Sequence, residues 1–221
     1  MFLPLRLSLF PGFVMAYVKV CGITNLDDAR AAVEAGADAL GFNFYRPSPR
    51  YIEPIAARAI IDKLPADVLT VGVFVNEETP KRVEEIANEA GVAALQLHGD
   101  ESPEYCVALK DRYVIKVFGV GGDFAPERAL AYDVQAVMLD ALDRKVRGGT
   151  GRMVDWLAAR RIRELVPKLF LAGGLSPRNV AEAIAAVRPY AVDACSSLES
   201  SPGRKDAARV RAFVAAVHQA G

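Results

Sequence analysis

The sequence is poor in the side chains that build metal centres and disulfide frameworks. Its 221 residues include two histidines and three cysteines, and Cys21, Cys106 and Cys195 lie far apart in the chain. An odd number of widely spaced cysteines does not predict a disulfide framework, and two histidines supply a zinc site poorly. We therefore expect no metal site and a reducing, cytoplasmic location.

An excess of charge and a long apolar run are missing as well. Lys and Arg number 27, as do Asp and Glu, so the formal net charge is zero. Nucleic-acid-binding proteins usually present a basic surface, so we expect no nucleic-acid partner. No apolar run approaches the roughly 18 to 20 residues that span a bilayer, which excludes a membrane protein. With 52% hydrophobic residues, the chain can instead build a sizeable globular core.

The first residues of the chain differ from the rest. Residues 1–14 are apolar, but Pro4 and Pro11 interrupt them and Arg6 is their only basic residue, so they make a poor signal peptide. Met15 stands directly before the first predicted strand. We expect translation to begin naturally at Met15, with residues 1–14 as an extension or flexible arm and residues 15–221 as one domain.

Eight apolar runs alternate with helical segments along the remaining chain. Most runs are continuously apolar, which is typical of strands buried on both faces of a parallel sheet. They begin near Tyr17, Asp38, Val68, Val92, Tyr113, Gln135, Lys168 and Tyr190. Helix-start signals lie between them at Asn25, Thr79-Pro80, Ser102-Pro103 and Ser176-Pro177. Eight β/α units without a G-x-G-x-x-G turn after the first strand predict an α/β protein with a single-domain (β/α)8 TIM barrel.

Reactive side chains stand where predicted strands end, the edge at which barrels carry their chemistry. Cys21 ends the first strand and Asp140 the sixth, so a thiol and a carboxyl could serve as base and acid. Arg50 lies in the loop after the second strand, which two prolines stiffen. Its planar guanidinium group can bind a carboxylate through two hydrogen bonds. His98, after the fourth strand, could contact substrate. Each residue also has an interpretation without a function. The cysteine could be a small core residue, the aspartate could cap the following loop, the arginine could be exposed to solvent, and the histidine could be structural.

Turns rich in glycine and serine follow the last three predicted strands. They contain Gly149, Thr150 and Gly151, then Gly173 and Gly174, then Ser196 and Ser197. Backbone amides in such turns can surround an anion, and turns after the last two strands match the usual phosphate site of a barrel. The residues alone therefore predict a barrel enzyme that isomerises a phosphorylated small molecule carrying a carboxylate.

Seven motifs in order give a more specific indication. They are KVCGIT (19–24), GFNFYRPSPRYI (41–52), VGVFVN (71–76), QLHGDE (96–101), GGTG (148–151), LAGGLSPRNV (171–180) and SPGRKD (201–206). Together they resemble the phosphoribosylanthranilate isomerase family of tryptophan biosynthesis, from about Val18 to the C-terminal helix. The resemblance implies a cofactor-independent Amadori rearrangement of N-(5-phosphoribosyl)anthranilate, an aldose–ketose isomerisation. The sequence leaves open whether the enzyme is a monomer or a homodimer.

The resemblance also assigns roles to the residues at the strand ends. Asp140 corresponds to the general acid that protonates the ribose ring oxygen, and Cys21 to the general base that removes the proton from ribose C2. Arg50 corresponds to the arginine that holds the anthranilate carboxylate. The phosphate is expected among the amides of Gly149–Gly151, Gly173–Gly174 and Ser196–Ser197.

One position departs from the family pattern. Ser197 stands where the family usually has glycine, and we expect either an added phosphate contact from its hydroxyl or a strained turn that weakens phosphate binding. Cys195, two residues earlier, is interpreted as a core substitution.

Two rival functions remain at this point. One is another phosphate-binding barrel enzyme, such as a ribulose-phosphate epimerase or an indole-glycerol-phosphate synthase. The epimerase would need metal-binding residues at several strand ends, and the synthase would need additional lysine and glutamate catalysts. The other rival is a non-catalytic sensor of phosphoribosyl ligands. The presence of both Cys21 and Asp140 argues against a sensor.

Overall fold

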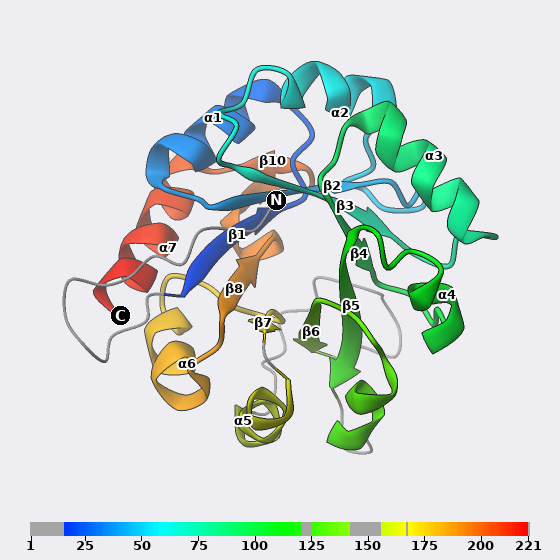
Figure 1. The fold of residues 1–221 in the computed structure, drawn as a ribbon. Coiled ribbons are helices and arrows are strands. Elements are labelled where there is room, and N and C mark those ends of the chain that lie inside the picture. The colour runs from blue at the N-terminus through cyan, green and yellow to red at the C-terminus, as the bar shows by residue number, and fades with distance from the viewer. Residues whose placement is uncertain (1–15, 121–124, 142–155, 167, 221) are drawn as a thin grey trace.

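A closed barrel of eight parallel strands forms the centre of the molecule. The computed structural model describes residues 16–120, 125–141, 156–166 and 168–220. Neighbouring strands pair in chain order and β8 closes the ring on β1 (Figure 1). The strands are β1 (Tyr17–Cys21), β2 (Ala39–Asn43), β3 (Leu69–Phe74), β4 (Ala94–Leu97), β5 (Tyr113–Val120), β6 (Ala136–Ala141), β7 (Leu169–Leu171) and β8 (Ala191–Ala194). The predicted TIM barrel is confirmed, and each strand begins within two residues of its predicted start. Residues 1–14, the predicted extension, lie outside the described part of the chain.

Helices surround the ring of strands (Figure 1). They are α1 (Leu26–Ala35), α2 (Pro54–Ile61), α3 (Pro80–Ala90), α4 (Pro103–Val107), α5 (Trp156–Leu165), α6 (Val180–Val187) and α7 (Ala207–Gln219). Between β5 and β6 the described residues form only a 3-10 helix, η1 (Pro126–Ala131), so the fifth β/α unit departs from the regular pattern. No described helix has the length and apolarity to cross a membrane.

Three predicted helix starts are confirmed by their capping bonds. The side chains of Asn25, Thr79 and Ser102 each accept a hydrogen bond from a backbone amide in the first turn of α1, α3 and α4. These bonds satisfy amides that have no acceptor within the helix.

The predicted start at Ser176-Pro177 is wrong, because α6 begins only at Val180. Asn179 directly precedes the helix, and its Oδ1 accepts hydrogen bonds from the Ser176 amide at 2.8 Å and the Ser176 hydroxyl at 3.2 Å. These bonds hold Ser176 within the loop, so the chain makes one further turn before the helix starts.

The strands divide the core into two apolar layers. Val18 and Val20 of β1 pack in the larger layer between barrel and helices, whereas Tyr17 packs in the layer inside the barrel. Side chains alternate along a strand, so Lys19 and Cys21 follow Tyr17 towards the inside. Along β1, the side chains that point inside the barrel are therefore the apolar Tyr17 at the start of the strand, the charged Lys19 in its middle and Cys21 at its end. Cys21 lies at the mouth of the barrel.

A small hairpin after β8 returns the chain to this mouth. The 3-10 helix η2 (Ser196–Leu198) leads into β9 (Glu199–Ser201), which pairs antiparallel with β10 (Arg204–Lys205). Gly203 turns the chain in the left-handed region with φ of 78°. The hairpin thereby brings two buried charged residues, Glu199 and Lys205, together.

Candidate active site

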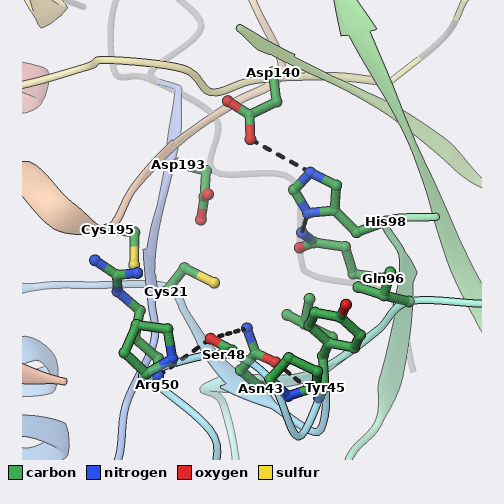
Figure 2. A pocket seen from close by; sticks show the side chains of 14 residues that line it. Cys21, Asn43, Tyr45, Ser48, Arg50, Gln96, His98, Asp140, Asp193 and Cys195 are labelled. Carbon is green, nitrogen blue, oxygen red and sulfur yellow. Dashed lines mark hydrogen bonds and ion pairs between the residues drawn. The ribbon is translucent and has the colours of Figure 1, made fainter. Parts of the chain in front are cut away.

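A cavity of about 380 Å³ opens where the barrel strands end (Figure 2). Four residues that the sequence singled out, Cys21, Arg50, His98 and Asp140, line it together. The remaining lining residues are Asn43, Tyr45, Pro47, Ser48, Pro49, Val73, Val75, Gln96, Asp193 and Cys195. Residues from distant strands therefore meet in one site, as the rule for parallel barrels predicts.

Cys21 is a buried thiol beside a buried ammonium group. Lys19, two residues earlier on the same strand face, is completely buried. A Cβ at Gly41 on β2 would lie 2.7 Å from Cys21 Sγ and 3.2 Å from Lys19 Nζ, so glycine leaves room for both groups. A hydrogen bond from Cys195 lowers the pKa of Cys21 well below its usual range, and the charges of Lys19 and Lys205 add to this effect against burial. Cys21 is thus predisposed to be a thiolate.

Cys195 lies in the wall of the cavity, so its interpretation as a core substitution is wrong. It directly follows β8, the strand that pairs with β1. Its hydrogen bond to Cys21, together with burial, raises the pKa of the Cys195 thiol well above its usual range. The pair therefore carries its negative charge on Cys21 and its proton on Cys195.

Lys19 also forms a buried ion pair inside the barrel. Its Nζ lies 2.7 Å from Asp193 Oδ1, and the two side chains are 0% and 9% exposed. Burial opposes the charge of Lys19, but the carboxylate of Asp193 and the thiolate of Cys21 outweigh it and raise the pKa of Lys19. Burial raises the pKa of Asp193 to about 6, against the opposing effect of Lys19. The 2.7 Å contact is that of a formed ion pair at neutral pH.

Arg50 is held by a second ionic group at the rim. Its Nε and Nη2 donate to the two carboxylate oxygens of Glu199 at 2.8 and 2.7 Å, and Lys205 Nζ lies 3.0 Å from the same carboxylate. The Ser48 hydroxyl accepts a bond from the Arg50 amide. The guanidinium group of Arg50, which we expected to hold a substrate carboxylate, is therefore bound to Glu199. These two bonds use two of the five guanidinium N–H groups, while the side chain still lines the cavity.

His98 and Asp140 point towards each other in the wall of the cavity (Figure 2). His98 Nε2 lies 3.4 Å from Asp140 Oδ2, and Gln96 Nε2 lies 3.5 Å from His98 Nδ1. The loop that carries His98 is anchored by the buried pair of Lys116 and Glu101, since Lys116 Nζ donates to Gly99 O and to Glu101 Oε2, both at 2.8 Å. His98 therefore contacts the predicted acid.

Two of the predicted phosphate turns lie within the described residues, and neither contributes to the lining of the cavity. Gly173 and Gly174 follow β7 with φ of 82° and 71°, and Ser196 and Ser197 open η2 after β8. Amides at the start of a helix have no acceptor within it. The Ser197 hydroxyl donates to Leu175 O and so joins the two turns. Gly149, Thr150 and Gly151 lie outside the described residues.

Ser197 does not occupy a strained turn. Among the described residues, the non-glycine positions with positive φ are Asn76 and Arg188, so the alternative of a strained turn at Ser197 is wrong. Its hydroxyl donates to Leu175 O, and the alternative of an added phosphate contact stays a prediction.

Several residues of the site were not predicted as site residues from the sequence. Asp193, Glu199 and Lys205 form the ionic groups that hold Lys19 and Arg50. A usable signal existed in β1 and β8, because each places one charged residue within an apolar strand. A charge there is costly unless it is paired, and strand alternation directs Lys19 and Asp193 to the same side as Cys21 and Cys195.

Comparison with known proteins gives one consistent result. The family model "N-(5'phosphoribosyl)anthranilate (PRA) isomerase" matches residues 18–216. The N-(5'-phosphoribosyl)anthranilate isomerase of Desulforudis audaxviator is 51% identical over 208 residues, which cover 93% of this chain and all of that protein.

Two similar crystal structures are informative for the site and the assembly. One is a phosphoribosyl anthranilate isomerase in complex with reduced 1-(o-carboxyphenylamino)-1-deoxyribulose 5-phosphate, with a TM-score of 0.83 and 43% identity. The other shows monomers generated from the dimeric enzyme of Thermotoga maritima, with a TM-score of 0.83 and 42% identity. Each alignment covers 93% of this chain and all of the other. The chain belongs to the phosphoribosylanthranilate isomerase family.

Proposed function

We propose that Cys21 is the general base and Asp140 the general acid of the reaction that this protein catalyses. That reaction is the isomerisation of N-(5-phosphoribosyl)anthranilate to 1-(2-carboxyphenylamino)-1-deoxyribulose 5-phosphate in tryptophan biosynthesis. The proposal depends on one observation: the two side chains reach the same cavity from β1 and β6. An acid and a base in one site are sufficient for an Amadori rearrangement.

The first step opens the ribose ring. Asp140 gives a proton to the ring oxygen, the bond from this oxygen to C1 breaks, and the anthranilate nitrogen supplies the electron pair that forms a protonated Schiff base. The carboxyl group of Asp140 is partly shielded, with 18% side-chain exposure, and His98 lies 3.4 Å from its Oδ2. His98 is thus placed to keep this carboxyl group oriented.

The second step moves a proton away from C2. The Cys21 thiolate removes the C2 proton, and the electron pair of that bond flows into the iminium group, which gives an enolamine. C1 then gains a proton and the C2 hydroxyl loses one, which leaves the ketone. The iminium group of the substrate serves as the electron sink, and the positive charges of Lys19 and Lys205 favour the thiolate form of the base.

Binding places the substrate between these two groups. We propose that Arg50 holds the anthranilate carboxylate through guanidinium N–H groups that Glu199 does not use, with Glu199 fixing the plane of the guanidinium group. The phosphate is proposed to lie at the amides of Gly173–Gly174 and Ser196–Ser197, where the turns after β7 and β8 meet. A contribution from Gly149–Gly151 stays a prediction.

We also infer a cytoplasmic enzyme that acts as a monomer or a homodimer. The reactive thiolate of Cys21 and its neighbour Cys195 are both unbridged, which suits a reducing compartment. Light scattering of the purified protein distinguishes the two assemblies.

Growth of a bacterial tryptophan auxotroph that lacks this isomerase tests the function. We expect the wild-type chain to restore growth and the Cys21→Ser and Asp140→Asn variants to restore it poorly. Absence of rescue by soluble wild-type protein would contradict the function. Full rescue by either variant, with turnover of the purified variant near normal, would contradict the role of that residue alone.

A further inference from the structure

Arg50 belongs to a group of three charged side chains, Arg50, Glu199 and Lys205, which we call the rim cluster. The Glu199 carboxylate accepts hydrogen bonds from Arg50 Nε and Nη2 at 2.8 and 2.7 Å and from Lys205 Nζ at 3.0 Å. The exposed fraction of the side chain falls from 15% at Arg50 to 4% at Glu199 and 0% at Lys205. Arg50 is the member of the cluster that lines the cavity (Figure 2).

Lys205 is a fixed and buried positive charge. It is the register partner of Glu199 in the β9–β10 hairpin. Its backbone amide donates to Asp28 Oδ2 at 2.8 Å, and its Nζ also donates to Cys195 O at 3.2 Å. Both ends of the residue are therefore held, and its charge can reach a ligand in the cavity only through Glu199 and Arg50.

Arg50 and Glu199 alone would form a pair without net charge. The guanidinium group already binds both carboxylate oxygens of Glu199, so this carboxylate is compensated without a lysine. A substrate carboxylate that approached Arg50 would then meet the repulsion of Glu199 as well as the attraction of Arg50. Lys205 leaves the rim cluster with one positive charge in excess. A buried charge is costly unless something compensates it, so this second cation requires an explanation.

The charged groups around the rim cluster do not supply this excess. Lys19 is paired with Asp193 at 2.7 Å. Asp28 lies in the first turn of α1, where the positive end of the helix dipole compensates a carboxylate. Cys21 lines the same cavity, and as a thiolate it would repel a substrate carboxylate. The attraction for an anion at Arg50 therefore depends on Lys205.

We propose that Lys205 is a positioning residue for substrate binding: its buried charge offsets that of Glu199, so that Arg50 can hold an aromatic carboxylate while it stays bound to Glu199. This inference rests on the proposed role of Arg50. It concerns the carboxylate of the substrate, whereas the sugar and phosphate should bind independently of Lys205. A packing role of Lys205 would affect all parts of the substrate alike.

The test compares two ligands that differ only in the carboxylate. One is the product, 1-(2-carboxyphenylamino)-1-deoxyribulose 5-phosphate, and the other is 1-(phenylamino)-1-deoxyribulose 5-phosphate. Titration calorimetry of the purified protein gives both Kd values, and their ratio is the preference for the carboxylate. Because charge-assisted hydrogen bonds are strong, we expect the wild type to bind the product at least about tenfold more tightly.

Lys205→Gln removes the charge but keeps an amide that can donate to Glu199. We expect its preference to fall below about threefold, with Kd of the phenyl ligand within about threefold of the wild type. Addition of Glu199→Gln restores the excess positive charge, so the double variant should recover the preference to within about threefold of the wild type. Arg46→Gln is the control, since Arg46 lies in the same loop as Arg50 with 76% of its side chain exposed, and it should keep the preference.

Arg50→Gln separates this inference from the proposed function. If Arg50→Gln keeps the full preference, the carboxylate does not bind at Arg50 and the proposed binding role fails. If Arg50→Gln loses the preference and Lys205→Gln keeps it, the inference alone is overturned. Equal weakening of both ligands in Lys205→Gln, or a double variant no better than the single one, would also overturn it. If Lys205→Gln does not fold, Lys205→Met provides the same comparison with an unbranched side chain.

Discussion

Replacement of Lys19 by methionine should show how strongly the protein depends on its inner ion pair. The change keeps an unbranched side chain and leaves Asp193 with 9% of its side chain exposed and no partner at 2.7 Å. Breaking a buried pair by removing one member costs about 3 to 5 kcal/mol. For a domain of this size each kcal/mol lowers Tm by about 2 to 4 °C, so we expect Tm to fall by about 6 to 20 °C.

The loss should depend on pH in a defined direction. Burial already raises the pKa of Asp193 to about 6 in the folded protein, against an ordinary value of 3.8, and removal of Lys19 raises it further. The folded state then binds a proton more tightly than the unfolded chain. The destabilisation should therefore be smaller at pH 5 than at pH 8.

Urea denaturation at both pH values measures this effect, and two further variants complete the test. Lys19→Met combined with Asp193→Asn removes the unpaired carboxylate and should recover more than half of the lost stability. Lys116→Met breaks the equally buried pair with Glu101 and should cost similar stability. A loss below about 1 kcal/mol for Lys19→Met at pH 8 would refute the reasoning.

Three further predictions concern the site directly. Cys21→Ser and Asp140→Asn should each lower kcat at least about a hundredfold with little change in KM, measured by steady-state kinetics; near-normal turnover would remove the assigned role. Arg50→Lys should raise KM about tenfold or more, because lysine lacks the planar guanidinium group. Arg46 lies in the same loop with 76% of its side chain exposed, so Arg46→Lys should leave KM unchanged. Equal KM values for both variants would contradict the carboxylate site. Ser197→Gly should lower the free energy of unfolding, measured by urea denaturation, by about 1 kcal/mol. It should change the inhibition constant of inorganic phosphate less than about twofold. A larger change in phosphate binding would show that the hydroxyl acts on the ligand.

The elements and the strand-end residues could be predicted because their signals are local. Continuous apolar runs mark strands buried on both faces, and Asn25 and Thr79 cap helices through bonds within one turn. Once the barrel was predicted, Cys21 and Asp140 followed as residues at strand ends that meet at one mouth.

The ionic groups could not be predicted because they join distant parts of the chain. Lys19 and Asp193 are 174 residues apart, and Arg50 and Glu199 are 149 residues apart, so only the strand register and the β9–β10 hairpin bring them together. The place of Cys195 in the wall of the cavity depends in the same way on the pairing of β8 with β1.

Two local errors have a different origin. Ser176 precedes a proline and carries an ordinary capping side chain, but Asn179 competes for its amide and hydroxyl. Ser197 replaces a glycine of the family, yet the chain forms a 3-10 helix there without a left-handed residue. In both cases the neighbouring backbone decides a conformation that residue preference alone does not determine.

Turnover of N-(5-phosphoribosyl)anthranilate that carries deuterium at ribose C2 tests the central claim most directly. The purified wild-type protein should form the C2 ketone, identified by carbon NMR, with a primary isotope effect on single turnover. Cys21→Ser should lose this turnover while still binding the product. A folded wild-type protein that forms no ketone, or a Cys21→Ser variant that forms it at the wild-type rate with the same isotope effect, would contradict the account.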